Sequence, residues 1–578
     1  MLTRKTKSII IFTAVSLIAF HTLYFIHFYG VDVPFWDEWS FADFAKTVDT
    51  GGPFWNNPHF LQHNEHRPFF PCLILAIDIL LFSWNTIHLM YFGWALLVIA
   101  VILFYRLLRK TDSTLTWLVI AIAAFQFNTA GYEFLLWGIA STAWCLTAIA
   151  IILCIYFLNK TNQSTFAIIP AIISGIVASF SEFNGLLIWP VGMIGLIFFK
   201  NTRKFPLVTW VISMAIVISI FFTNYNFSTH KGIQVSTLFT INGISYVITY
   251  LTNGLSFSDD RLRIIVGIFI IAWIVFGPIY LKLKKVKLGR LVVWILFGFI
   301  GVLSAVITEL GRLGLADSTS PRYLLMSSFS QISALVMITF VFLYLYRKTI
   351  GKTRKSILIS IYSIFIIMVI LSLVPSYSLG WYMGSISYYQ RSEGLQCLMN
   401  SNSNYECPFL LDNPNFLAVQ AKKLQALDLG PFKTKSPTII PQDPLLENKN
   451  WKNMTGDLEG KGYVDHIGSN LTSSAQIFNF TRQSDSIMVD GWAFLDDKKL
   501  PINSIYAFVD NKVEGKFFYG LYRPDVAKAY GYGTTDYSGW QGVIWIHDLA
   551  NGCHNVSVRL VHGDRFYSLS TISKICIN

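Results

Sequence analysis

Charged residues are scarce in this 578-residue chain: Asp, Glu, Lys and Arg together make up 13% of it, whereas hydrophobic residues make up 53%. Soluble globular domains carry about twice that share of charge. The composition excludes an intrinsically disordered chain, a collagen-like chain and a small disulfide scaffold. It predicts an integral membrane protein whose surroundings include membrane lipid.

Several signature motifs are missing as well. The sequence has no P-loop, no Gly-x-Gly-x-x-Gly turn, no Gly-x-Ser-x-Gly elbow and no Cys-x-x-Cys metal pair. Energy coupling through nucleotide hydrolysis is therefore not expected. The net charge of +12 falls in short basic clusters between apolar runs, where it sets membrane orientation, so nucleic acid is not an expected partner.

The first apolar run, residues 8–28, follows a basic N-terminal stretch and is long enough to span a bilayer. The positive-inside rule places the N-terminus in the cytoplasm and the loop 30–67 outside. Similar runs recur as far as Pro375. Eleven spans result if the doubtful runs 70–83 and 237–254 do not cross, and thirteen if both cross.

Eleven spans keep every basic cluster on the cytoplasmic side, so eleven is preferred and thirteen remains open. The predicted fold is a polytopic α-helical membrane protein of 11 to 13 transmembrane helices, in the cytoplasmic (inner) membrane. Either count places the chain after Pro375 outside the cytoplasm.

The last third of the chain differs in kind. Residues 376–445 form a loop-rich connector with one amphipathic helix expected at 414–427. Residues 446–578 alternate short apolar and polar runs punctuated by Gly, Asn and Asp, which predicts an extracytoplasmic β-sandwich. Residues 1–375 form the transmembrane domain.

Four of the seven cysteines lie in this polar region. Two disulfides are predicted there, Cys397 with Cys407 and Cys553 with Cys576, and they require an oxidising compartment.

The long first loop carries the residues Trp36, Asp37, Glu38 and Trp39 near its start. A carboxylate held between tryptophans can take a proton from a sugar hydroxyl or bind a metal, and tryptophan faces suit sugar rings. Asp37 and Glu38 are the catalytic candidates. The alternative is that the tryptophans anchor at the interface and the carboxylates are merely solvated.

The same loop ends with His63, Glu65, His66 and Arg67, directly before an apolar run. Such groups are costly beside lipid unless they have partners or a function. His63 and His66 could hold a divalent metal with Glu65, although His-x-x-His alone is a weak metal signal.

Further polar residues lie at the predicted outer ends of spans. Glu133 and Glu182 fall in short outward turns and would line a shared cavity, or else cap helix ends. Arg312 and Arg322, the latter followed by Tyr323, are candidates for binding a lipid-linked phosphate. For Arg312 the alternative is contact with a lipid headgroup or with Glu309.

Together, the N-terminal anchor, the acidic pair Asp37 and Glu38, the His/Glu/Arg cluster, the many spans and the outward C-terminal domain resemble the GT-C membrane glycosyltransferases. The resemblance covers about residues 1–375. It implies a polyprenyl-phosphate-linked sugar as donor, Asp37 as the base that activates the acceptor hydroxyl, and Arg322 as the residue that holds the donor phosphate. Metal dependence stays open, because the Asp-Glu arrangement departs from that of some members.

The sequence therefore predicts sugar transfer, with inversion, from a polyprenyl phosphate to a cell-envelope glycan or lipid-linked acceptor on the outer face. A transporter or flippase of lipid-linked sugars is one alternative, although the repeated halves typical of transporters are not evident. A polysaccharide polymerase or ligase is a second, and a non-catalytic assembly factor is a third.

Overall fold

A computed structural model gives the fold of the chain. It describes residues 3–198, 204–226, 235–257, 259–313, 316–400, 407, 409–411, 413–433, 455–468, 470–471, 477–480, 486–495, 504–521, 523–530, 538–545, 549–562, 565–569 and 573–577. The chain divides into two compact units. Unit one comprises residues 1–34 and 43–388, and unit two comprises residues 35–42 and 389–578.

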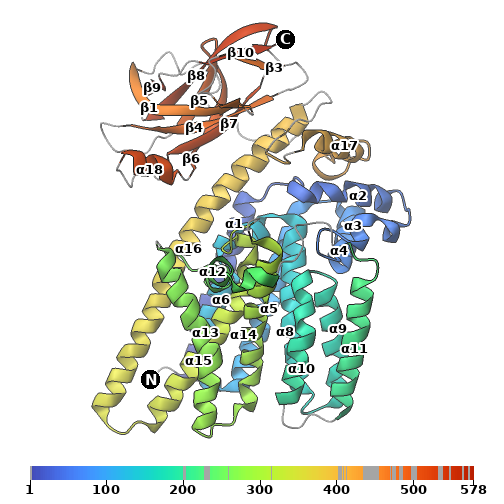
Figure 1. Cartoon of the computed structure of the whole chain (residues 1–578), viewed down its shortest axis with the longest axis vertical. Coiled ribbons are helices and arrows are strands. Elements are labelled where there is room, and N and C mark those ends of the chain that lie inside the picture. The colour runs from blue at the N-terminus through green and yellow to red at the C-terminus, as the bar shows by residue number, and fades with distance from the viewer. Residues whose placement is uncertain are drawn as a thin grey trace. The chain divides into compact units, whose positions relative to one another are not determined.

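Within the described residues, nine helical segments are long and apolar enough to cross a membrane (Figure 1). They contain α1 (Arg4–Tyr29), α5 (Thr86–Thr111), α6 (Val119–Gln126) with α7 (Tyr132–Leu136), α8 (Gly138–Lys160), α11 (Lys204–Phe222), α13 (Asp260–Leu283), α14 (Val292–Arg312), α15 (Leu324–Lys348) and α16 (Lys352–Asn400). Helices suit a bilayer because each satisfies its main-chain hydrogen bonds within itself.

Two shorter apolar helices, α9 (Ile168–Ser179) and α10 (Ile188–Phe198), lie in the bundle beside α8 and α11 (Figure 1). They form a hairpin joined by the 3-10 turn η6 (Phe183–Leu187). The indoles of Trp189 and Trp210 are both fully buried and lie with their ring centroids 4.5 Å apart, tilted by 35°, which packs α10 against α11. Counting α9 and α10 with the nine long segments gives eleven, the number preferred from the sequence.

The two doubtful runs form short helices. The α4 helix (Phe69–Phe82) begins where the N–H of Phe70 bonds to the carbonyl of Phe180, just after α9. Soon after α4 ends, the N–H of Thr86 bonds to Asp32, just after α1. Both flanks of α4 thus meet the same end of the bundle. The α12 helix (Ile241–Tyr250) has ten residues and, among the described residues, does not belong to the long or the shorter apolar helices.

The basic clusters gather at one end of the bundle, called here the basic end. Arg347 pairs with Asp112 at 3.2 Å, and Thr111 bonds to the carbonyl of Arg290. Lys110 and Lys160 both lie over the ring of Tyr156. The other end, where residues 43–68 lie, is called the loop end.

The α16 helix differs from the sequence prediction, which ended the last span at Pro375 and expected loops beyond it. The helix continues through Pro375 to Asn400. Proline is tolerated inside spanning helices when neighbouring groups satisfy the freed main chain. Here the next residues dock on the bundle: Ser376 bonds to Asn128, and Tyr377 bonds to the carbonyl of Ala124.

Unit two contains the predicted helix, α17 (Pro414–Gln425), and a β-domain. The strands are β1 (Thr455–Ile467), β2 (Asn470–Leu471), β3 (Ile477–Phe480), β4 (Ser486–Phe494), β5 (Ser504–Val509), β6 (Lys512–Leu521), β7 (Gly539–Trp545), β8 (Gly552–His562), β9 (Arg565–Leu569) and β10 (Ser573–Ile577), with helix α18 (Pro524–Tyr530) between β6 and β7.

These strands confirm the predicted sandwich and add a detail to it. One sheet runs β2-β1-β4-β7-β6. The other runs β6-β5-β8-β10-β3, and β9 pairs with both β8 and β1. Strands β1 and β6 take part in both sheets, so the sandwich closes into a barrel. Both predicted disulfides, Cys397–Cys407 and Cys553–Cys576, are confirmed.

Candidate active site

A tight turn at the end of the first loop fixes two of the predicted residues. The main chains of His63 and His66 exchange two hydrogen bonds, each 2.9 Å long. Asn64 adopts the left-handed conformation inside the turn, with φ of 50°, which asparagine tolerates better than most residues. The turn holds Glu65 and His66 side by side.

His66 joins two glutamates that lie far apart in the sequence. Its Nδ1 lies 2.9 Å from Oε2 of Glu182, and its Nε2 lies 3.5 Å from Oε1 of Glu65. The N–H of Phe183 also approaches Nδ1, at 3.1 Å. Arg312, the last residue of α14, donates from Nη2 to Glu65 Oε1. Three segments therefore meet in one charged network at the loop end.

The charges in this network reinforce one another. Burial alone would raise the pKa of Glu65, but the charges of His66 and Arg312 outweigh it and lower the pKa to about 2. Burial alone would lower the pKa of His66, but Glu182 and Glu65 raise it to about 9. At neutral pH Glu65 is a carboxylate and His66 an imidazolium. Its positive charge then lies between the carboxylates of Glu182 and Glu65.

Arg322 lies in the 3-10 turn η10 (Pro321–Tyr323) and is held by a single nitrogen. Its Nε lies 3.1 Å from Ser320 Oγ and 3.3 Å from Glu133 Oε2. Its guanidinium lies over the Tyr323 ring, 5.7 Å from the centroid. Among the residues that the structure describes, none bonds to its Nη1 or Nη2. The two outer nitrogens of Arg322 are thus available to a ligand.

Tyr323 lies between the two arginine networks. Its ring stacks on Tyr250 at 5.6 Å and meets Trp144 edge-on at 6.1 Å, and only 4% of the residue is exposed. The charges of Arg322 and Arg312, with those of their acidic partners, all act on its hydroxyl. The structure therefore gathers Glu65, His66, Glu133, Glu182, Arg312, Arg322 and Tyr323 at one end of unit one.

Two other predicted residues make local contacts. Arg67 donates from Nε to the carbonyl of Phe221 at 2.6 Å, and from Nη2 to that of Thr223. Its Nη1 donates to the carbonyl of Leu61 at 3.2 Å. Arg67 thus caps the end of α11, where a cation is favoured. The ring of His63 lies against His59, with the two Nδ1 atoms 3.5 Å apart.

The four residues near the start of the loop belong to unit two, in the 3-10 turn η1 (Trp36–Phe41). Trp36 is 45% exposed and Trp39 is fully buried. Glu38 is also fully buried, and its Oε2 accepts the N–H of Phe35 at 3.1 Å. Asp37 is half-buried. Two adjacent carboxylates therefore occupy different environments.

Glu309 was not among the site residues predicted from the sequence, where it was considered only as an alternative partner for Arg312. Arg312 pairs with Glu65 instead. Glu309 is fully buried, and within the described part of the chain neither carboxylate oxygen has a hydrogen-bond partner. Its Oε1 would lie 2.7 Å from a Cβ added at Gly243. An acidic residue inside an apolar span was the available signal.

The charged side chains gathered at this site are three carboxylates, Glu65, Glu133 and Glu182, and three cations, His66, Arg312 and Arg322. In the ranges described above, no three His, Cys, Asp or Glu side chains are grouped as metal ligands. His63, Glu65 and His66, which the sequence suggested as ligands of a divalent metal, therefore do not form such a group in the described residues. The hydrogen-bond donors without a partner among the described residues are Nη1 and Nη2 of Arg322, and a planar guanidinium matches the geometry of phosphate oxygens.

Fold and site together define an integral membrane protein with a charged site at one end of a helical bundle. No protein-family model and no curated protein sequence matches the chain. The structure is similar to the apo form of the Archaeoglobus fulgidus oligosaccharyltransferase, with 13% identity and a TM-score of 0.42, covering 75% of this chain and 62% of that one.

It is also similar to the oligosaccharyltransferase AglB of the same archaeon, solved with an inhibitory peptide and a dolichol-phosphate. That match has 13% identity and a TM-score of 0.40, and covers 76% of this chain and 62% of that one. At this identity the likeness concerns the course of the chain alone.

Proposed function

We propose that this protein is a membrane glycosyltransferase that moves a sugar from a polyprenyl-phosphate donor to a cell-envelope glycan or lipid-linked acceptor. An acceptor hydroxyl oxygen forms a bond to the anomeric carbon as the bond from that carbon to the donor phosphate breaks, with inversion. The hydroxyl proton passes to a carboxylate, and the polyprenyl phosphate leaves with the negative charge. No nucleotide takes part, which agrees with the absence of nucleotide motifs.

The observation that carries this proposal is the state of Arg322. Bidentate binding of a phosphate needs an arginine whose two Nη groups are unspent and whose plane is fixed. Ser320 and Glu133 fix Arg322 through Nε, and Tyr323 supports one face of the guanidinium. The two Nη groups are therefore held in position to donate hydrogen bonds to two oxygens of the donor phosphate.

The other two arginines of the predicted site fit this role less well. Arg67 uses Nε, Nη1 and Nη2 on main-chain carbonyls. Arg312 has one Nη committed to Glu65. Its guanidinium, with the His66 imidazolium, adds positive charge near the leaving phosphate, while Glu65 and Glu182 keep both cations in place.

Asp37 is our choice for the general base. Glu38 commits a carboxylate oxygen to the Phe35 N–H and is fully buried, whereas Asp37 keeps part of its side chain exposed. The exposed face of Trp36 next to it suits a sugar ring.

We place the reaction on the extracytoplasmic face of the cytoplasmic membrane. The two disulfides of unit two support this, since such bonds persist in oxidising compartments. The β-domain is assigned to acceptor binding or to structural support.

The test uses the full-length chain in detergent and farnesyl phosphate as a soluble probe of the donor phosphate. Arg322→Ala should weaken binding by about tenfold or more, the worth of a charge-assisted hydrogen bond. Arg322→Lys keeps the positive charge but loses the planar fork, so its affinity for farnesyl phosphate should lie between those of wild type and Arg322→Ala. The control is Arg354→Ala, which changes an exposed arginine in the first turn of α16.

The same variants should be scored in cells by mass spectrometry of envelope glycans. Arg322→Ala at wild-type protein levels should lose one sugar from the product, and Arg354→Ala should not. Equal farnesyl phosphate affinity in Arg322→Ala and Arg354→Ala would show that Arg322 does not bind the phosphate. An unchanged glycan profile in Arg322→Ala would contradict the proposed reaction.

A further inference from the structure

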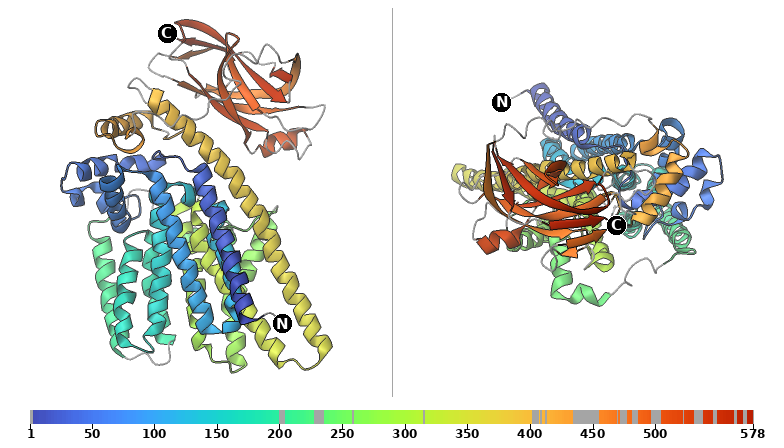
Figure 2. Two further views of the ribbon diagram at one scale, coloured as in Figure 1. Left: turned by 180° about the vertical axis from the view of Figure 1, so that it is seen from behind. Right: turned by 90° about the horizontal axis from the view of Figure 1, so that it is seen from above.

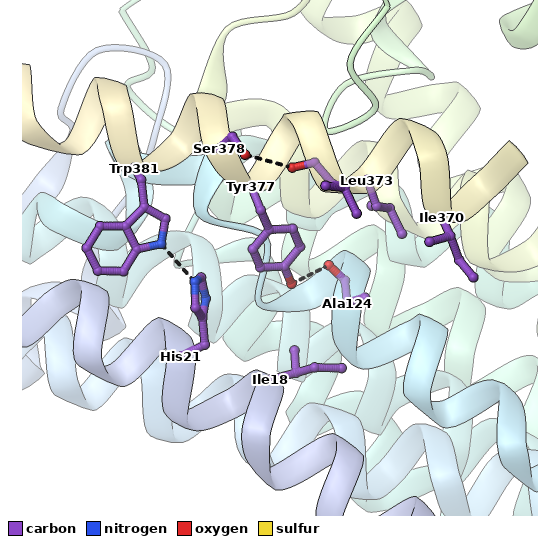
Figure 3. Close-up of a pocket in the computed structure, with 9 residues that line it drawn as sticks. Ile18, His21, Ala124, Ile370, Leu373, Tyr377, Ser378 and Trp381 are labelled. Atoms are coloured by element: carbon purple, nitrogen blue, oxygen red, sulfur yellow. Dashed lines mark hydrogen bonds between the residues drawn. The ribbon is translucent and has the colours of Figure 1, made fainter. Parts of the chain in front are cut away.

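A crevice lies between the three spanning helices α1, α6 and α16 of unit one (Figure 3). Ile18 and His21 of α1 form one wall, and Leu373, Tyr377 and Trp381 of α16 form another. Seen from behind, α1 lies beside the middle of α16 (Figure 2), where His21 and Tyr24 contact Trp381. The crevice is apolar except for the polar groups of His21, Tyr377, Ser378 and Trp381.

One of these groups is a buried donor without an acceptor. The indole N–H of Trp381 donates to His21 Nε2 at 2.8 Å. Because an indole nitrogen can only donate, Nε2 carries no proton and the neutral ring carries its proton on Nδ1. Nδ1 is buried and has no hydrogen-bond partner among the described residues. By contrast, the Tyr377 hydroxyl is satisfied by the carbonyl of Ala124 at 2.9 Å.

The position of His21 in the membrane follows from its aromatic neighbours. The ring of Trp381 lies 5.9 Å from that of Tyr24 and 6.2 Å from that of Phe28. Tyr24 and Phe28 are 46% and 54% exposed. Tyrosine and tryptophan concentrate at the membrane interface. His21 lies about one turn of α1 before Tyr24, on the hydrocarbon side of this aromatic level.

Toward the basic end the crevice continues between Ile18, Ile370 and Leu373, which offer no polar side-chain atom. It opens onto a lipid-facing surface, since Val374 is 60% exposed and only 11% of the most apolar stretch of α16 is buried. An apolar channel below a single donor matches a molecule with a hydrocarbon chain and an acceptor oxygen at its upper end.

We infer that this crevice binds one glycerophospholipid. Its acyl chain lies along Ile18, Ile370 and Leu373, and its ester carbonyl accepts the hydrogen bond from His21 Nδ1. A polyprenyl phosphate fits this pattern poorly, because its chain has no oxygen below the phosphate. The lipid fills the space between α1 and α16, and this inference does not depend on the proposed reaction.

The test measures retained lipid on the full-length protein by native mass spectrometry, after delipidation in detergent and incubation with palmitoyl-oleoyl phosphatidylglycerol. Val374→Trp fills the crevice from α16. Its matched control is Ile367→Trp on the same helix, because Ile367 is 53% exposed and lies outside the crevice. His21→Phe keeps a ring of similar size and removes the donor.

Wild type and Ile367→Trp should each retain one phosphatidylglycerol. Val374→Trp and His21→Phe should bind it about tenfold more weakly, roughly the worth of one buried hydrogen bond in the second case. Equal retention by Val374→Trp and Ile367→Trp would overturn the site. Unchanged retention by His21→Phe, or preferential retention of an added polyprenyl phosphate, would overturn its assignment to a phospholipid ester.

Discussion

At the scale of single residues, Asp37 and Glu38 share a turn but differ in their surroundings. Glu38→Gln keeps an oxygen that can accept the Phe35 N–H, so activity should stay close to that of wild type. Asp37→Asn removes the basicity of the side chain and should lower sugar transfer by at least about a hundredfold, the usual worth of acid-base catalysis. Product formation at matched protein levels measures both effects.

The two variants also control for each other. Full activity of Asp37→Asn together with a large loss in Glu38→Gln would assign the base to Glu38. Full activity of both Asp37→Asn and Glu38→Gln would show that this turn does not supply the general base.

The Glu65–His66–Glu182 network predicts a pH dependence of stability. The folded-state pKa of His66 is about 9, above its ordinary value of 6.5. The stabilisation from its charge is therefore complete below pH 6.5 and is lost as the pH rises to 9. Each unit of pKa difference is worth about 1.4 kcal/mol. The thermal midpoint in detergent should fall across this window.

His66→Gln should flatten that slope, because it removes the group that titrates. His63→Gln is the matched control, since it removes an imidazole of the same turn that lies against His59. The interpretation would be wrong if His66→Gln and wild type lost stability in parallel between pH 6.5 and 9.

The sequence predicted the composition of the charged site better than its pairing. The predicted topology placed polar residues at the ends of several apolar runs on one surface, and in the structure Glu182 and Arg312 both belong to the network around Glu65 and His66. Which carboxylate meets which cation depends on helix rotation and packing. Glu309 was therefore considered as an alternative partner of Arg312, whereas in the structure Glu65 binds it.

At the scale of elements, α16 docks on the turn after α6 through a close approach at Gly380. A Cβ added there would lie 2.2 Å from the carbonyl carbon of Thr129. Because that neighbour is main chain, it cannot move aside cheaply. Gly380→Ala should lower the unfolding free energy by on the order of 1–3 kcal/mol, the usual cost of overpacking.

Gly277→Ala is the matched control in another spanning helix. Its added Cβ would meet the nearest atoms at 3.5 Å, an ordinary contact, and alanine is favoured over glycine inside helices by about 0.5–1 kcal/mol. Thermal unfolding should separate the two variants in opposite directions. A Gly380→Ala protein as stable as Gly277→Ala would contradict the docking of α16.

Element lengths were predictable where hydropathy changed sharply, and less so elsewhere. The end of the last span was placed at Pro375 because proline usually stops a helix. Contacts from Asn128 and Ala124 to the residues just beyond it hold the helix together. Such contacts join residues about 250 positions apart, and no local pattern reveals them.

At the scale of the whole molecule, the charge rule decided between eleven and thirteen spans, and the structure offers a direct way to check that choice. The free cysteines Cys72, Cys145 and Cys154 are buried, and the other four form disulfides. A single exposed cysteine added to the native chain should therefore react alone with a membrane-impermeant maleimide. No cysteine-free background is needed.

Four exposed lysines serve as labelling positions: Lys46 in the first loop, and Lys110, Lys284 and Lys352 beside the basic end. With eleven spans, Lys46→Cys should react in intact cells, and the other three only after the membrane is permeabilised. With thirteen, Lys110→Cys would react in intact cells, because a crossing α4 inverts the segment that follows it. Lys284→Cys and Lys352→Cys stay inside in both cases and serve as controls. Labelling of Lys110→Cys from outside would therefore show that α4 crosses the membrane and that Arg109 and Lys110 lie on the outer side, against the charge rule.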